Sequence, residues 1–232
     1  MRTIGLLGGM SWESTATYYR LINETVRERL GALHSAELVL YSVDFEPLER
    51  MQHRGDWVGA ARVLARAASG VEAAGAAVLV LCTNTMHKLA PQIELAIGIP
   101  LLHIADAAAG EIREAGISTV GLLGTSFTMA QEFYRGRLVE RHGIEVLIPD
   151  ERERETVHRV IYDELCAGEI RDDSRAEYVK IIEGLAARGA EAVVLGCTEI
   201  PLLVRPADSP IPIFDTTAIH ARRAVEWALE GE

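Results

Sequence analysis

Two cysteines occupy matching positions in the two halves of the chain, and each directly follows an apolar run. Cys82 follows residues 78–81 (VLVL), and Cys197 follows residues 193–196 (VVLG). A buried cysteine can serve simply as a small hydrophobic residue. Two thiols that face one carbon can also remove a proton from one side and return a proton to the other. The matched pair favours the second role, with one cysteine contributed by each half.

The second half of the chain repeats the first at a nearly constant offset. Residues 3–8 (TIGLLG) match residues 119–124 (TVGLLG), and the two cysteines lie 197 − 82 = 115 residues apart. Three further pairs of segments match in the same order: 18–20 with 133–135, 71–76 with 185–190, and 99–102 with 211–214. A period of this length indicates duplicated domains, because the repeats of solenoid proteins are only about 20–50 residues long.

Short β-rich segments alternate with amphipathic helical segments, which predicts parallel sheets built from right-handed crossovers. We expect an α/β fold with two pseudo-symmetric domains, each a parallel-type sheet flanked by helices, and an active site in the interdomain cleft. The expected domains are residues 1–104 plus 208–232, and residues 105–207. The expected strands are 3–7, 38–42, 77–81, 101–103, 119–123, 145–148, 192–195 and 212–214. The expected helices are 15–30, 60–74, 128–141, 156–165, 175–188 and 217–229, with Ser11 or Ser14 capping the first.

Composition narrows the classes of partner. The chain has 232 residues, of which 49% are hydrophobic, so it can bury the core of one large or two small domains. A net charge of −11 argues against nucleic acid, whose partners carry basic patches. No apolar run approaches the roughly 18 residues of a membrane span. An odd number of cysteines without a secretory signal indicates a reducing cytoplasm.

The segments that follow the predicted strands carry polar groups. Ligands of open parallel sheets bind at the carboxyl ends of the strands, where both cysteines are expected. If a helix starts after each cysteine, its N–H groups would favour an anion and lower the pKa of the thiol. Hydrogen-bonding residues follow each cysteine: Thr83, Asn84 and Thr85 after the first, Thr198 and Glu199 after the second.

A glycine turn follows the first predicted strand. Gly8 and Gly9 lack the G-x-G-x-x-G spacing of a dinucleotide site, but their N–H groups could hold a carboxylate or a phosphate. The matching turn of the second half offers the hydroxyls of Thr125 and Ser126, and Thr128 is expected to cap the helix that follows.

Metal and cofactor chemistry find little support in the residue spacing. Zinc would need both cysteines and a histidine such as His87 or His220, without any C-x-x-C or H-x-x-x-H motif. A pyridoxal phosphate enzyme needs a Schiff-base lysine, and only Lys88 lies near a cysteine motif. A Cys/His hydrolase pair would leave the second cysteine without a role. We therefore expect no cofactor and no metal.

With these motifs in place, the chain resembles the cofactor-independent aspartate/glutamate racemase family, closest to its bacterial broad-specificity amino-acid racemase branch. The resemblance rests on residues 8–15 (GGMSWEST), 82–88 (CTNTMHK) and 196–199 (GCTE). It implies an isomerase with Cys82 and Cys197 as catalytic acid/bases, a small amino-acid substrate and a homodimer. The substrate-binding residues that it implies are Met10, Gln52, Thr83, Asn84, Thr85, Thr125, Thr128 and Thr198.

Two positions depart from the aspartate-specific relatives, which carry an arginine after the second strand and a lysine near a helix end in the second domain. Residues 44–50 (DFEPLER) leave the arginine without a clear match, and Cys166 stands where the lysine is expected. Both changes remove positive charge that would hold a side-chain carboxylate, which favours a broad substrate range. Arg50, Arg54 or His87 could compensate.

Several other activities fit the same residues. Within the same superfamily they are a hydantoin racemase, a cis-trans isomerase and a decarboxylase, although a single-cysteine decarboxylase would not need both thiols. From other classes they are a non-catalytic amino-acid-binding protein, and a phosphate or nucleotide binder that uses the glycine turn.

Overall fold

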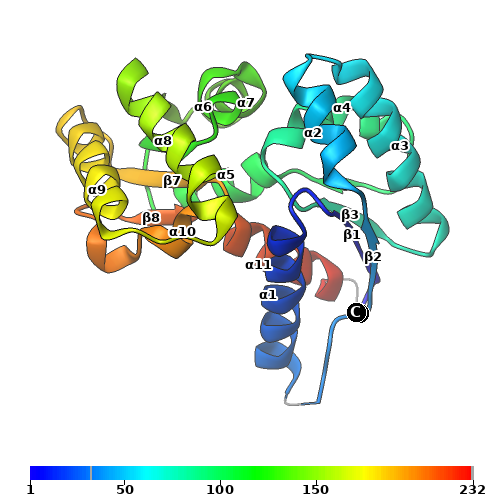
Figure 1. Cartoon of the computed structure of the whole chain (residues 1–232). Coiled ribbons are helices and arrows are strands. Elements are labelled where there is room, and N and C mark those ends of the chain that lie inside the picture. Colours follow the sequence, from blue (N-terminus) through cyan, green and yellow to red (C-terminus); the bar gives the residue numbers. More distant parts are fainter. Residues whose placement is uncertain (32, 231–232) are drawn as a thin grey trace. The chain divides into compact units, whose positions relative to one another are not determined.

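The structure is a computed structural model that describes residues 1–31 and 33–230. The chain divides into two compact units, Met1–Ile104 with His220–Glu232, and Ala105–Ile219. Each unit holds one sheet with helices on its faces (Figure 1). Among the described residues, no helix combines the length and the apolar character that a bilayer crossing requires.

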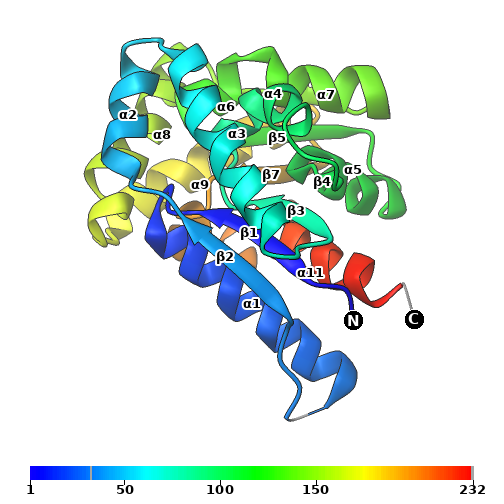
Figure 2. The same ribbon diagram turned by 90° about the vertical axis from the view of Figure 1, so that its right-hand side faces the viewer.

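The first unit is built on a four-stranded parallel sheet within the described residues, in the order β2-β1-β3-β4. Its register sets Leu6 beside Leu40 and Val80. One face packs on α1 and α11, and the other packs on α2, α3 and the segment after β3 (Figure 2). The strands are β1 (Ile4–Gly8), β2 (Leu38–Ser42), β3 (Val78–Leu81) and β4 (Leu101–Leu102). The helices are α1 (Trp12–Leu30), α2 (Phe45–His53), α3 (Trp57–Ala73), η1 (Thr85–Leu89), α4 (Ala90–Glu94) and α11 (Thr216–Leu229).

The second unit repeats this plan, with the described strands in the order β6-β5-β7-β8, all parallel. Alternate residues of β5 and β7, such as Leu123 and Leu195, pack on α8, α9 and α10. The strands are β5 (Thr119–Gly124), β6 (Glu145–Leu147), β7 (Ala192–Gly196) and β8 (Ile213–Asp215). The helices are α5 (Ile104–Glu114), α6 (Ser126–Ala130), α7 (Glu132–His142), α8 (Glu151–Asp163), η2 (Leu165–Ala167), α9 (Asp172–Ala187), α10 (Ile200–Leu203) and η3 (Pro206–Asp208).

The internal repeat is confirmed by the strand order and by matched glycine contacts. A Cβ atom on Gly121 would lie 2.9 Å from Leu185 Cδ1, so α9 can cross β5 closely only because this residue is glycine. At the equivalent place in the first unit, a Cβ on Gly5 would collide with Val71 of α3. Gly5 with Val71 and Gly121 with Leu185 are the pairs that the sequence repeat aligns.

The predicted fold class and all eight predicted strands are confirmed. The return to the first unit falls after Ile219 rather than after residue 207, because β8 pairs with β7 and stays in the second sheet. Helices α2, α4, α5 and α10 lie outside the predicted helices, and the helix expected over 128–141 is divided into α6 and α7. Ser11 caps α1 by accepting a hydrogen bond from the Ser14 N–H.

A buried polar cluster joins α1, α11 and β4 inside the first unit. The Tyr18 hydroxyl lies 2.9 Å from His220 Nδ1, and His220 Nε2 lies 2.8 Å from the Leu102 carbonyl oxygen. Because a carbonyl only accepts, Nε2 carries the proton and Nδ1 accepts from the tyrosine. Burial lowers the pKa of His220 to about 4, so the imidazole is neutral in the folded protein at neutral pH.

We predict that His220 makes folding stability dependent on pH. The unfolded chain takes up a proton at His220 near pH 6.5, whereas the folded chain does so near pH 4, so stability falls as the pH falls through this window. The full difference is about 3 kcal/mol. Urea unfolding at pH 7 and pH 4.5 should show a smaller loss for His220→Gln than for the natural protein. The exposed His34→Gln serves as the control, and an unchanged pH dependence in His220→Gln would contradict the assignment.

Candidate active site

The turn after β1 is fixed by the first residues of α1. The Gly9 N–H donates to Thr15 Oγ1 at 2.8 Å, and this hydroxyl donates to the Ser11 carbonyl oxygen at 2.9 Å. Gly9 has φ +93°, in the region that favours glycine, and a Cβ on Gly8 would collide with the Thr15 side chain. One threonine therefore holds the strand-to-helix turn closed around two glycines.

Cys82 is held by its backbone on both sides at the carboxyl end of β3. Its N–H donates to the Leu7 carbonyl oxygen at 2.9 Å, and its own carbonyl oxygen accepts from Ser14 Oγ at 3.1 Å. The thiol is fully buried, and its sulfur lies 3.8 Å from the Val80 carbonyl oxygen. Burial raises the pKa of the Cys82 thiol far above its usual range, so the thiol is protonated at neutral pH.

The segment after Cys82 is anchored by a histidine. His87 Nδ1 lies 2.7 Å from the Thr83 carbonyl oxygen, and its Nε2 accepts from the Ile104 N–H at 3.2 Å. The first bond needs a proton on Nδ1 and the second needs a bare Nε2, which defines the neutral tautomer. The predicted binding residues Thr83, Asn84 and Thr85 are all buried here. His87 thus positions their backbone.

The two other candidate residues of the first unit lie on different elements. Met10 lies in the turn after β1, and Gln52 lies in the last turn of α2, and both are buried. The Lys88 ammonium lies over the Trp57 ring at 3.9 Å, which ties η1 to the start of α3. The structure therefore brings Met10 and residues 82–85 to one edge of the first sheet, with Gln52 supplied by α2.

In the second unit, Thr125 and Thr128 form a close pair at the end of β5. Thr125 caps α6, because its Oγ1 accepts the Thr128 N–H at 3.3 Å. Thr128 is fully buried with its hydroxyl 3.2 Å from Thr125 Oγ1, and its methyl group would lie 3.0 Å from a Cβ on Gly196. The expectation that Thr128 caps the helix is wrong: Thr125 precedes the first turn and takes that role.

Cys197 has a charged partner. Its Sγ donates to Glu199 Oε2 at 2.9 Å, and the Thr198 hydroxyl donates to the same oxygen at 2.6 Å. Burial is the main cause that raises the pKa of the Cys197 thiol, and the Glu199 carboxylate raises it further. The thiol is therefore protonated at neutral pH, like that of Cys82.

The expected lowering of the thiol pKa values by helix N-termini is wrong for both cysteines. Short helices do begin just beyond them, η1 at Thr85 and α10 at Ile200. Desolvation outweighs these few N–H dipoles, because each sulfur lies inside an apolar cluster. Each thiol is thus suited to donate a proton, whereas its conversion to a base requires an acceptor.

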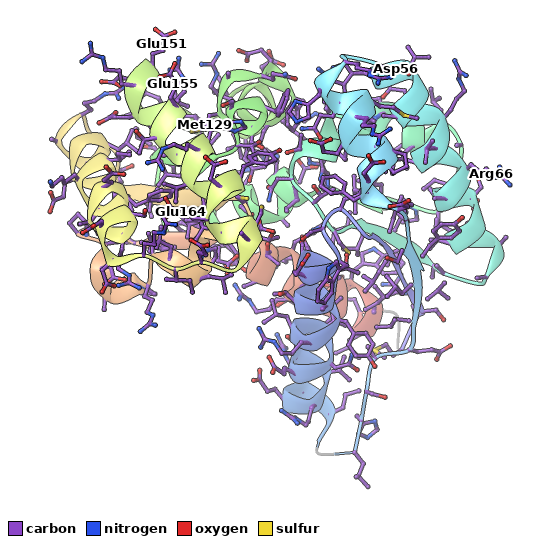
Figure 3. All side chains as sticks on the ribbon, in the orientation of Figure 1. Asp56, Arg66, Met129, Glu151, Glu155 and Glu164 are labelled. Atoms are coloured by element: carbon purple, nitrogen blue, oxygen red, sulfur yellow. The ribbon has the colours of Figure 1, made fainter. Side chains whose placement is uncertain are left out.

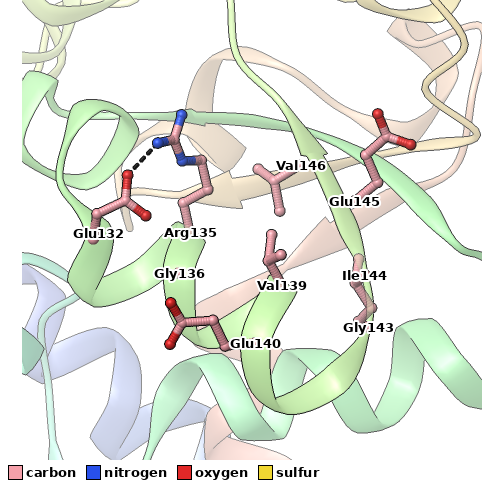
Figure 4. Close-up of a pocket in the computed structure, with 9 residues that line it drawn as sticks. All are labelled: Glu132, Arg135, Gly136, Val139, Glu140, Gly143, Ile144, Glu145 and Val146. Atoms are coloured by element: carbon pink, nitrogen blue, oxygen red, sulfur yellow. Dashed lines mark hydrogen bonds and ion pairs between the residues drawn. The ribbon is translucent and has the colours of Figure 1, made fainter.

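Other features of the second unit involve none of the predicted site residues. A groove of about 460 Å³ is lined by residues of α7 and β6, with an ion pair between Glu132 and Arg135 (Figure 4). It contains none of the predicted site residues.

Glu164, at the opposite end of α8 from Glu151 and Glu155 (Figure 3), is buried and accepts from Ser174 Oγ at 2.5 Å. Cys166 follows in η2 and is exposed.

Within residues 1–31 and 33–230, no three His, Cys, Asp or Glu side chains are placed to share a metal ion.

Residue spacing did not reveal Thr15, which closes the glycine turn, or the anchoring role of His87. The sequence predicts Ser14 only as a helix cap, and Glu199 only as one hydrogen-bonding residue after Cys197. The position of Glu199, two residues after Cys197, is the signal in the sequence that could have revealed its contact with the thiol.

Comparison with known proteins agrees with this geometry. The model of the Asp/Glu/hydantoin racemase family matches residues 7–224, so the chain belongs to this family and is an isomerase of the racemase type. The family expected from the three motifs is confirmed.

Three relatives illustrate the similarity. The chain is 23% identical to a broad-specificity amino-acid racemase of Bacillus subtilis, over 97% of this chain and 98% of that protein. A crystal structure of a candidate Asp/Glu racemase from Yersinia pestis is 56% identical, with a TM-score of 0.94, and the match covers 99% of this chain and 100% of that one. An aspartate racemase homologue from Pyrococcus horikoshii is 35% identical, with a TM-score of 0.87, covering 98% and 99%.

We predict that Ser14→Ala loosens the Cys82 segment. The variant leaves the buried Cys82 carbonyl without the Ser14 hydroxyl, which should cost about 1–3 kcal/mol of stability. Thr17→Ala is the matched control, because its hydroxyl bonds to a carbonyl of the same helix at an exposed position. Urea unfolding should separate the two variants, and equal midpoints would show that the Ser14 contact contributes nothing.

Proposed function

We propose that this protein is a PLP-independent amino-acid racemase of the aspartate/glutamate type that uses Cys82 and Cys197 as two bases. One thiolate removes the α-proton of the substrate, and the other thiol donates a proton to the opposite face. The observation that carries the proposal is the equivalence of the two thiols: both are buried, both are protonated, and both follow the equivalent central strand of a repeated sheet.

The carbanion formed between the two proton transfers needs stabilisation. Fixed donors around the substrate carboxylate would spread its charge, and they are effective where water is excluded. We propose that Thr83, Asn84, Thr85 and Thr198 supply these donors, and that Met10, Gln52, Thr125 and Thr128 line the pocket. The burial of Thr83, Asn84 and Thr85 at the end of β3, beside Cys82, supports this role.

The substrate range is proposed to be broad. Of the residues that could replace the missing positive charge, Arg50 is exposed and paired with Glu46, and both ring nitrogens of His87 are engaged by the backbone. Cys166 supplies no charge. The similarity to a Bacillus subtilis racemase named for its broad specificity supports the same choice.

By the same resemblance, we propose that the protein is a homodimer, works in the cytoplasm and acts without a cofactor.

The test is a panel of L- and D-amino acids in deuterium oxide, with loss of the α-proton followed by NMR. We expect exchange and inversion with several amino acids, among them aspartate or glutamate. Cys82→Ser and Cys197→Ser should each lower racemisation by about 10²–10⁴-fold, the range typical for loss of a general acid or base. Cys166→Ser is the matched control and should retain activity.

Other results would overturn the proposal. Ligand binding without exchange, unaffected by either cysteine substitution, would indicate a binding protein. Exchange with hydantoins, or decarboxylation of a malonate-type substrate, would indicate another activity of the superfamily. Exchange with aspartate alone would overturn the broad substrate range.

A further inference from the structure

Three buried histidines of the first unit meet where the chain crosses between its two units. The first crossing follows Ile104, and the second precedes His220. The centroid of the His87 ring lies 4.6 Å from that of His103 and 5.8 Å from that of His220. All three side chains are buried, and all three belong to the first unit. One residue of the Cys82 motif therefore faces both crossings.

Hydrogen bonds connect His87 to the first crossing. Its Nε2 accepts from the Ile104 N–H at 3.2 Å, and Ile104 is the first residue of α5. The first N–H groups of a helix have no acceptor within that helix, so the imidazole supplies one. Its Nδ1 donates to the Thr83 carbonyl oxygen at 2.7 Å. One imidazole therefore bridges the start of α5 and the segment that follows Cys82.

The second crossing is bound to the same short stretch of chain. His220 Nε2 donates to the carbonyl oxygen of Leu102 at 2.8 Å, two residues before Ile104. Both crossings are therefore held at residues 102–104, at the end of β4 and the start of α5. His87 links this stretch to the candidate binding residues 83–85.

We infer that His87 is a positioning residue that holds the substrate-binding segment 83–85 at a fixed distance from residues 102–104 at the chain crossings. The inference rests on the proposed racemase function and deepens it. His87 acts through the Thr83 carbonyl group and is assigned no contact with the substrate.

The segment after Cys82 is short enough to need such an anchor. Helix η1 has five residues, and a 3-10 helix has poorer hydrogen-bond geometry than an α-helix. Catalysis is sensitive to the placement of binding groups, since a displacement of about 1 Å can lower a rate by about 10²-fold. An imidazole with both nitrogens bonded has one tautomer and one orientation. It therefore fixes the distance between Thr83 and Ile104.

Two variants separate this role from simpler ones. His87→Asn places an amide nitrogen near the position of Nδ1, so it can keep the Thr83 bond but loses the Ile104 bond. His87→Phe fills the volume of the ring and loses both bonds. If His87 served only as a local anchor for Thr83, the Asn variant would behave like the natural protein. If His87 only filled space, the Phe variant would do so.

The first arm of the test measures racemisation, after activity of the natural protein has been established. Both variants should lower kcat/KM by about 10²-fold, with most of the loss in kcat, because misplaced groups affect the transition state most. Tyr18→Phe is the matched control, since it removes a buried hydrogen bond to His220 but keeps both bonds of His87. It should lower the urea midpoint and leave kcat unchanged. A natural kcat in either His87 variant would overturn the inference, whereas a natural protein that racemises no amino acid would overturn the proposed function itself.

The second arm needs no activity. With Cys166→Ser and Cys197→Ser in place, Cys82 is the sole thiol, and its reaction with Ellman's reagent under native conditions reports local opening. Both His87 variants should raise this rate by about 10–100-fold, the effect of one lost buried hydrogen bond on a local opening equilibrium. Tyr18→Phe should leave the rate unchanged. Equal rates in His87→Asn and Tyr18→Phe would overturn the inference.

A measurement on the natural protein decides the question if the His87 variants do not fold. Nitrogen-15 NMR of imidazole-labelled protein at neutral pH should show His87 as a neutral ring with its proton on Nδ1, because the bonds to Thr83 and Ile104 require this form. A proton on Nε2, or a charged ring, would overturn the inference.

Discussion

Both candidate catalytic thiols are removed from water, and this desolvation dominates their chemistry. A cysteine in water is a few per cent thiolate at neutral pH, whereas burial at the ends of β3 and β7 keeps Cys82 and Cys197 protonated. A buried thiol is thus ready as an acid. The proposed two-base mechanism also needs one of the two cysteines as a thiolate, so it requires a group that takes a proton from that thiol.

The scaffold meets this constraint by fixing the backbone around each cysteine. Ser14 of α1 holds the Cys82 carbonyl, His87 holds the Thr83 carbonyl, and Thr15 closes the adjoining turn. These contacts are possible because α1 begins directly after the glycine turn, which places Ser14 within hydrogen-bond distance of the Cys82 carbonyl oxygen. In the second unit, the Glu199 side chain itself accepts the hydrogen bond from the thiol. The two halves therefore share a fold but differ in the group that lies next to the thiol proton.

Much of the fold could be predicted from the sequence because its signals are local. Each strand is a short apolar run, and the repeat relates Gly5 and Val71 to Gly121 and Leu185, contacts that the structure shows. The elements that were missed had weaker local signals. Helix α2 has Pro47 in its first turn, where proline is tolerated. The extent of the second domain depends on the pairing of β8, which is a tertiary contact that local sequence does not reveal.

The site could be predicted only in part for a related reason. Residue types and spacing point to both cysteines and to the polar residues after them as candidates. They could not give the direction of the thiol pKa shifts, because burial is a property of the packed unit, and they could not show which hydroxyls are already engaged. Thr128 and Thr198 look alike in sequence, yet one is fully buried against glycine and the other donates to Glu199.

In the proposed mechanism, one group takes the α-proton from the substrate and a different group delivers a proton to the product. The most direct measurement starts from one pure enantiomer in deuterium oxide and follows initial deuterium content at Cα in substrate and product separately. We expect solvent deuterium in the newly formed enantiomer and protium in the remaining substrate, because in the proposed mechanism one thiol takes the proton and the other delivers a solvent-derived one. A product that keeps the substrate's own α-proton would show that a single group serves both faces, and would contradict the two-base mechanism.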